Sequence, residues 1–104
     1  MYIVTIHYPN SDGATFDFDY FHRQHLPEVG KVFHPFGLGW ATVMRGEESL
    51  DGSPPAHFAV TVLSFPTEQA AREAVASDGA MTLMADLANF TTVTPQMQFN
   101  TSVE

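Results

Sequence analysis

Apolar and polar residues are spaced differently along the chain, and the changes predict alternating strands and helices. Tyr2–Tyr8 alternates branched or aromatic residues with others, as a strand does, and ends at the turn-forming residues 9–13. Asp17–Phe33 carries apolar residues at helical spacing, with Thr15 as the expected N-cap and a bend expected at Pro27. The first third of the chain therefore predicts a strand followed by a long amphipathic helix.

The remaining elements follow the same reasoning. Two further strands and two further helices are predicted at Leu38–Arg45, His57–Phe65, Glu68–Ala76 and Ala80–Leu87, with a loop at Gly46–Ala56. In the second of these helices Met81, Leu83, Met84 and Leu87 are expected to be buried. Thr91–Phe99 is predicted as the last strand, and Pro95 within it cannot donate to a ladder, which indicates a sheet edge.

The predicted order βαββαβ is that of the split βαβ, ferredoxin-like arrangement, an α+β fold with a four-stranded antiparallel sheet. We expect residues 1–104 to form one domain. Helices on one side leave the other sheet face bare, and the third predicted strand has no polar register, so that face is expected to be apolar. A bare apolar sheet favours a homodimer that forms through the sheet faces.

Composition restricts the partners of this domain. The formal charge is −8, from four Lys and Arg against twelve Asp and Glu, which makes nucleic acid and anionic membranes poor partners. No apolar run approaches the ~20 residues of a membrane span, and the first ten residues lack the basic start of a signal peptide. There is no cysteine, which rules out disulfides and a thiol nucleophile. A cytoplasmic location is the expectation.

One titratable residue lies among the apolar positions of the first helix. The apolar side carries Phe18, Phe21, His22, His25, Val29, Val32 and Phe33. His25 lies within roughly 20° of the centre of this arc on an ideal helix. Its ring is either a core histidine bonded to a backbone carbonyl or the acid/base group of a pocket. Tyr20 falls on the opposite side, so we expect it at the surface or at a subunit contact.

Two further polar residues are candidates for the same site. Asp86 lies in a largely apolar stretch and needs a partner. It either orients His25, as an aspartate orients a catalytic base, or caps the turn at residues 89–91 through backbone amides. Tyr8 shares a strand face with Val4 and Ile6, so its hydroxyl either enters the pocket or reaches solvent.

The sequence does not indicate a metal or a resident cofactor. His22 and His25 have i, i+3 spacing, but a catalytic metal usually takes three protein ligands in compact geometry, and no HExxH motif occurs. Dinucleotide and phosphate-loop fingerprints are missing as well. We therefore expect no metal and no bound cofactor.

Motifs in order along nearly the whole chain resemble the EthD family of the dimeric α+β barrel superfamily. They are Tyr8-Pro9-Asn10, Ala14-Thr15-Phe16-Asp17, Tyr20, His25, Pro27, Gly79, Met84-Ala85-Asp86 and Asn89-Phe90-Thr91. Position 88 is Ala where many members of the family have Pro, so the loop that places Asn89 is expected to be looser. The resemblance implies a dimeric ferredoxin-like fold with an internal pocket. It does not imply one reaction, because the superfamily includes cofactor-independent monooxygenases and lactone isomerases.

These observations predict a small enzyme that acts, without a bound cofactor, on a small apolar organic molecule bearing a carbonyl, lactone or hydroxyl. Isomerisation, dehydration and an oxidoreductase-type oxygenation through an enolate are all compatible with such a site, and the sequence does not choose among them. His25 would move the proton, Asp86 would orient it, and Tyr8 or Asn89 would donate to the oxygen where charge develops. Phe18, Phe21 and His22 are the other expected ligand contacts. The alternative is a non-catalytic carrier of an apolar ligand, or an accessory protein of an oxygenase.

Overall fold

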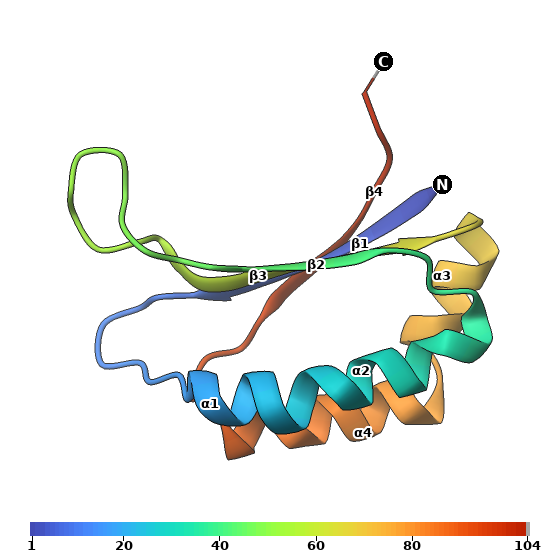
Figure 1. The fold of residues 1–104 in the computed structure, drawn as a ribbon, viewed down its shortest axis with the longest axis horizontal. Helices are drawn as coiled ribbons and strands as arrows, with labels where there is room; N and C mark the ends of the chain where they lie inside the picture. The colour runs from blue at the N-terminus through green and yellow to red at the C-terminus, as the bar shows by residue number, and fades with distance from the viewer. Residues whose placement is uncertain (104) are drawn as a thin grey trace.

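The computed structural model describes residues 1–103, which form an antiparallel sheet covered by helices on one face (Figure 1). The four strands are β1 (Tyr2–Pro9), β2 (Ala41–Arg45), β3 (His57–Phe65) and β4 (Gln96–Asn100). Their order in the sheet is β2-β3-β1-β4, and all pairings are antiparallel. The predicted ferredoxin-like α+β fold is confirmed. β4 lies at the predicted sheet edge, although Pro95 precedes the strand and does not interrupt it.

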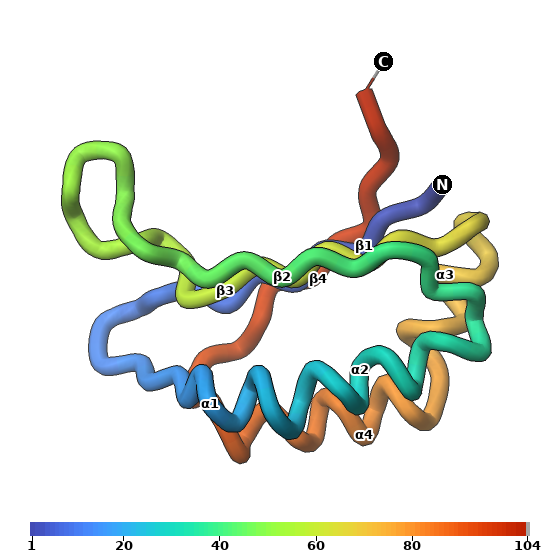
Figure 2. Tube along the Cα trace, viewed as in Figure 1, coloured from blue at the N-terminus to red at the C-terminus, as the bar shows by residue number. Residues whose placement is uncertain are grey.

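The helical segments lie below the sheet, and α2 packs beside α4 (Figures 1 and 2). The first predicted helix consists of α1 (Phe18–Tyr20), the π-helical turn η1 (Phe21–His25), α2 (Leu26–Phe33) and the 3₁₀ turn η2 (His34–Phe36). The second helical region consists of α3 (Glu68–Val75), α4 (Asp78–Asp86) and the 3₁₀ turn η3 (Leu87–Asn89). Within residues 1–103 no helix has the length and apolar character that a membrane span requires.

The first helix begins two residues later than an N-cap at Thr15 predicts. Asp17 is the N-cap, and its Oδ1 accepts a hydrogen bond from the backbone N–H of Tyr20 at 3.1 Å. Thr15 is engaged elsewhere, because its carbonyl accepts from the Thr91 hydroxyl at 2.8 Å and its N–H donates to the Thr92 hydroxyl at 3.0 Å. This tertiary pairing holds Thr15 extended beside the segment that leads into β4.

The π-helical turn changes which side chains share a face of the first helix. The N–H of Leu26 donates to the carbonyl of Phe21, an i→i+5 bond, immediately before Pro27, which has no N–H to donate. In an α-helix residues five apart are separated by roughly 140° around the axis. The i→i+5 bonding brings Tyr20 and His25 to the same side, while His22 is exposed. An ideal α-helix therefore predicts the wrong side for two residues. It puts Tyr20 opposite His25, and it puts His22 among the buried apolar residues.

The inner face of the sheet and the helices enclose two core clusters. One is built around Val4, Leu63 and Phe65 with Phe33 of α2, and the other around Tyr8, Phe21, Ala59 and Phe90. In α4 the buried face consists of Ala80 and Leu83. Met81 and Met84 lie off that face and are 67% and 44% exposed, so the prediction that they are buried is wrong.

The outer face of the sheet is mixed and not uniformly apolar, which corrects the prediction. The β1 and β4 register places His7 opposite Gln96, Thr5 opposite Gln98 and Ile3 opposite Asn100 on this face. β3 contributes an apolar row, Val60 and Val62, opposite His7 and Thr5, and Met44 of β2 lies beside Val60 on the same face. The prediction was based on β3 alone, whereas the polarity of the outer face also depends on the side chains of β1 and β4.

Gly79 marks a close approach of α4 to Val32 of α2. A Cβ at Gly79 would lie 2.7 Å from Val32 Cγ1, whereas a Cβ at Gly30 would meet nothing within 4 Å. Gly79→Ala is expected to lower the free energy of unfolding, because overpacking costs about 1–3 kcal/mol and the gain in helix propensity offsets only about 0.5–1 kcal/mol. Urea unfolding of Gly79→Ala and of the matched control Gly30→Ala, which is expected to stabilise by about 0.5–1 kcal/mol, checks this. Equal effects of the two substitutions would contradict it.

Candidate functional site

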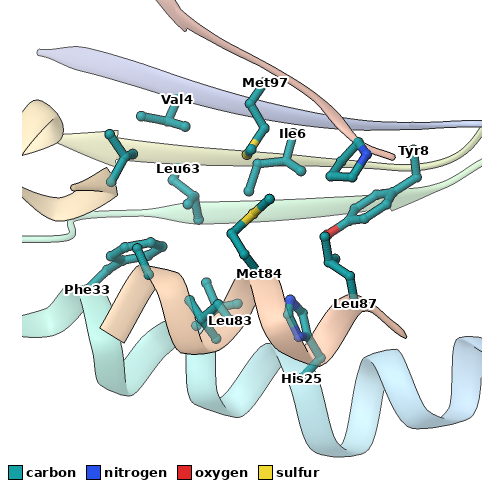
Figure 3. A pocket seen from close by; sticks show the side chains of 14 residues that line it. Val4, Ile6, Tyr8, His25, Phe33, Leu63, Leu83, Met84, Leu87 and Met97 are labelled. Carbon is teal, nitrogen blue, oxygen red and sulfur yellow. The ribbon is translucent and has the colours of Figure 1, made fainter. Parts of the chain in front are cut away.

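A cavity of about 140 Å³ lies between the inner face of the sheet and the helices α2 and α4 (Figure 3). Its wall is almost entirely hydrocarbon and thioether. The lining residues are Val4, Ile6, Tyr8, His25, Val29, Phe33, Leu63, Val75, Ala80, Leu83, Met84, Leu87, Pro95 and Met97. Val75, Met84 and Met97 are also solvent-exposed, so the cavity opens between α3, α4 and β4.

His25 contributes an imidazole to the wall of this cavity. The residue is 4% exposed, and its ring rises from the first helix toward the sheet near Met84 and Leu87 (Figure 3). The ring packs against Phe90 with centroids 4.6 Å apart. Its Nδ1 lies 2.9 Å from Asp86 Oδ2, and Nε2 has no hydrogen-bond partner in the described part of the chain. Two hypotheses were open for His25. The structure agrees with the one that places the ring at a pocket, because its Nδ1 faces a carboxylate and not a backbone carbonyl.

Asp86, the last residue of α4, joins three side chains. Its Oδ2 faces His25 Nδ1, while its Oδ1 accepts from the Tyr20 hydroxyl at 2.6 Å and from Asn89 Nδ2 at 2.9 Å. The backbone amides of Phe90 and Thr91 donate to the Leu87 carbonyl, so Asp86 does not cap that turn.

The hydrogen bonds decide the ionisation of Asp86. Desolvation acts to raise its pKa, but the hydrogen bonds from Tyr20, Asn89 and His25 together outweigh it and lower the pKa below the usual range. An ionised carboxylate only accepts hydrogen bonds, so His25 Nδ1 must donate. The lone pair of neutral His25 is then on Nε2.

Tyr8 supplies the second polar group of the cavity. The residue is 2% exposed, and its hydroxyl is directed toward Leu87 and the cavity, not toward solvent (Figure 3). This hydroxyl donates to no group among residues 1–103. Burial raises the pKa of Tyr8, so the phenol keeps its proton and remains a donor.

The other predicted site residues lie around the cavity or away from it. Phe21 packs against both Tyr8 and His25, with centroids 5.6 and 5.9 Å apart. Asn89 donates to Asp86 and does not line the cavity. Phe18 and His22 line a separate groove beside β2, where the Arg45 guanidinium lies 4.0 Å from the Phe18 ring.

Tyr20 bonds to Asp86 together with His25 and Asn89, although the sequence analysis expected it at the surface or at a subunit contact. The signal that could have found it is the EthD resemblance, because Tyr20 is among the residues that carry it. For metals, the described residues contain no group of three or more His, Asp or Glu side chains that could hold an ion.

The sequence is similar to a curated protein of comparable length. No family model matches the chain. A protein of Rhodococcus erythropolis, described as an uncharacterized 11.0 kDa protein in the thcB-thcC intergenic region, is 36% identical over 93 residues. The match covers 86% of this chain and 84% of that protein.

Solved structures share the fold over nearly the whole chain. An EthD-like protein from Ralstonia eutropha has a TM-score of 0.83 at 29% identity, over 95% of this chain and 88% of that one. An ethyl tert-butyl ether D (EthD) family protein from Bacillus halodurans has a TM-score of 0.73 at 17% identity, over 99% and 100%. A cofactor-independent oxygenase from Streptomyces nogalater has a TM-score of 0.63 at 17% identity, over 99% and 92%, and shows the fold alone. By these likenesses the chain is EthD-like and has the ferredoxin-like fold of the dimeric α+β barrel proteins.

Proposed function

We propose that this protein is a small enzyme that carries out acid/base chemistry, without a bound cofactor, on a small neutral organic molecule bearing a carbonyl, lactone or hydroxyl oxygen. One observation carries the proposal. His25 Nδ1 lies 2.9 Å from the carboxylate of Asp86, while the ring itself lines an apolar cavity. A base that is oriented from behind and shielded from water is the arrangement that proton transfer requires.

The proposed first step is removal of a proton from the carbon next to a carbonyl. His25 Nε2 takes the proton, and the electron pair of the broken C–H bond moves onto the carbonyl oxygen to give an enolate. The Tyr8 hydroxyl donates to that oxygen, and Asp86 stabilises the imidazolium. If a C=C bond adjoins the deprotonated carbon, the intermediate is a dienolate, and return of the proton to its far carbon gives isomerisation. If the adjoining carbon carries a hydroxyl, the electron pair returns to form a C=C bond while the proton leaves with that hydroxyl as water, which gives dehydration. Both reactions balance without an external oxidant.

The cavity supports a small neutral substrate. At about 140 Å³ it is smaller than the roughly 300–1,000 Å³ of sites for drug-sized ligands. No Lys or Arg is among the described residues that line it, and the carboxylate of Asp86 lies directly behind His25. A substrate carboxylate or phosphate would therefore lack a counter-charge. A cofactor-independent oxygenase has the same fold, so this fold can hold an enzyme that works without a cofactor. That likeness does not identify a substrate for this chain.

The test is hydrogen exchange in a simple ketone. In D₂O the folded protein is expected to catalyse replacement of the α-hydrogens of cyclohexanone by deuterium, measured by mass spectrometry, because this exchange needs only the first step. Positioned acid/base groups contribute about 10²–10⁴-fold, so the rate should exceed that of free imidazole at the same concentration. Urea-unfolded protein is the matched control. A rate no higher than that of imidazole or of the unfolded chain would contradict the enzyme proposal.

A ligand carrier or oxygenase accessory protein is the second candidate, favoured by the otherwise wholly apolar wall of the cavity. Phenol and toluene are probes of nearly equal size, and only phenol can bond to His25 or Tyr8. Equal affinities in an NMR titration, together with no exchange activity, favour the carrier. Tighter binding of phenol favours a site that recognises oxygen.

We also propose that two copies of the chain associate through their outer sheet faces. Helices leave that face bare, and Val60 and Val62 form an apolar row on it. Sedimentation equilibrium would detect twice the 11.5 kDa chain mass, and a monomer at micromolar concentration would contradict the association.

A further inference from the structure

The hydrogen bonds behind His25 extend to a third side chain that the mechanism above does not use. We propose that Tyr20 is a positioning residue, which locks the Asp86 carboxylate so that His25 carries its proton on Nδ1 and presents the Nε2 lone pair to the cavity. The consequence for turnover rests on the proposed function. The consequence for the His25 tautomer does not.

The geometry divides the two carboxylate oxygens between different partners. Oδ1 of Asp86 receives the Tyr20 hydroxyl at 2.6 Å and Asn89 Nδ2 at 2.9 Å, and Oδ2 lies 2.9 Å from His25 Nδ1. Two donors on Oδ1 oppose rotation of the carboxylate about its Cβ–Cγ bond. Oδ2 therefore remains aimed at Nδ1, since any rotation would break both bonds.

The proton between Tyr20 and Asp86 stays on the phenol. The hydrogen bond to Asp86 is the main cause that raises the pKa of Tyr20, with desolvation second. The same bond contributes to the lowered pKa of Asp86. Near neutral pH Tyr20 is thus the donor and Asp86 the acceptor, which is the condition under which Nδ1 of His25 must donate.

Tyr20 reaches Asp86 from outside the cavity. Its ring packs nearly parallel to Phe90, with centroids 6.1 Å apart and an interplanar angle of 19°. The residue lines an outer groove between the helices together with Gln24, Glu28 and Asn89, and it does not line the cavity. The Tyr20 hydroxyl can therefore influence a ligand in the cavity only through Asp86 and His25, whereas the Tyr20 ring also contacts Phe90, which packs on His25 and Tyr8.

The π-helical turn makes this contact possible. Tyr20 directly precedes η1 and His25 ends it, so the i→i+5 bonding places both side chains toward α4, where Asp86 lies. Single π turns within α-helices occur often at functional sites. Here the turn brings the positioning residue and the proposed base to the same carboxylate.

The test removes only the Tyr20 hydroxyl. In Tyr20→Phe the ring can still pack on Phe90, while Oδ1 loses a charge-assisted bond. ¹⁵N NMR of the neutral His25 ring, without ligand, is expected to show at least about a tenfold rise in the ratio of the Nε2–H to the Nδ1–H tautomer, given the strength of such bonds. The kcat for cyclohexanone exchange should fall about tenfold with KM unchanged, because Tyr20 does not touch the cavity. Tyr2→Phe, which alters a tyrosine packed on Phe99 at 5.8 Å, is the matched control and should change neither quantity.

Each outcome decides one proposal. An unchanged tautomer ratio in Tyr20→Phe overturns the positioning role, whatever the rate. A shifted ratio in a protein whose wild type shows no exchange activity supports the positioning role and contradicts the proposed function. Should Tyr20→Phe not fold, Asn89→Ala removes the second donor to Oδ1 from an exposed residue and is expected to shift the ratio in the same direction. An unchanged ratio in that variant also overturns the proposal.

Discussion

Replacement of His25 by glutamine is expected to lower the rate of cyclohexanone α-hydrogen exchange by about 10²–10⁴-fold, the usual contribution of a general base. Glutamine fills similar space and retains a group that can hydrogen-bond to Asp86, but its amide cannot take up a proton near neutral pH. Circular dichroism and urea unfolding should show a folded chain, because the ring contacts with Phe21 and Phe90 are only partly lost. His25→Ala is expected to lose activity equally, with the fold and any dimer retained.

His22→Gln is the matched control for the His25 variants. His22 lies three residues earlier on the same helical segment, is exposed, and does not line the cavity. Its replacement should leave the exchange rate within about twofold of the wild type, since surface substitutions have small effects. Full activity in His25→Gln would remove His25 from the mechanism. Unfolding of both His25 variants would assign the residue a structural role in the core.

Asp86→Asn is expected to reduce the exchange rate up to about 10⁴-fold, as replacement of an orienting aspartate does in catalytic triads. The asparagine amide can donate to Nδ1 of His25, which would place the ring proton on Nε2 and remove the lone pair from the cavity. Binding of toluene, a ligand without oxygen, should be unchanged because Asp86 does not line the cavity. Loss of toluene binding together with activity would indicate collapse of the cavity and not a changed tautomer.

The same substitution should change how stability depends on pH. Because the pKa of Asp86 is lowered in the folded protein, its ionised form contributes stability above the ordinary aspartate pKa of about 3.9. That contribution is lost as the pH falls from about 5 through this value toward the lowered folded pKa. Urea unfolding at pH 7, 5, 4 and 3 should therefore show a smaller loss of stability in Asp86→Asn than in the wild type. Asp12→Asn in the exposed turn after β1 is the control, and parallel curves for Asp86→Asn and the wild type would contradict the expectation.

Much of the fold could be predicted from local pattern. His57–Phe65 is predicted and observed with the same bounds, because a run of branched and aromatic residues without charge favours a strand in any surroundings. The edge position of the last strand follows from the predicted βαββαβ order, while Pro95, which suggested it, lies just before the strand. The helix that carries His25 follows from its apolar spacing, although its N-cap is set by the pairing of Thr15 with residues 91 and 92.

The site could be predicted only in part. The arc places His25 on the inward side of its helix, and the apolar surroundings of Asp86 indicate that it needs a partner. Neither observation shows whether the partner of His25 is a backbone carbonyl or a carboxylate. His25 and Asp86 are 61 residues apart in the sequence, so the distance between them depends on how α4 packs against the first helix. The exclusion of Tyr20 failed for a related reason, since a single i→i+5 turn shifts the phase of every later residue.

Periodicity along the chain was sufficient for the order of strands and helices and for the inward positions of Phe21, His25, Val29 and Phe33, because these depend on residues a few positions apart. Packing between distant segments decided the rest: the mixed outer face, the joining of Tyr20, Asp86 and His25, and the cavity itself. A cavity is space that side chains from several elements fail to fill, so no single stretch of sequence encodes it.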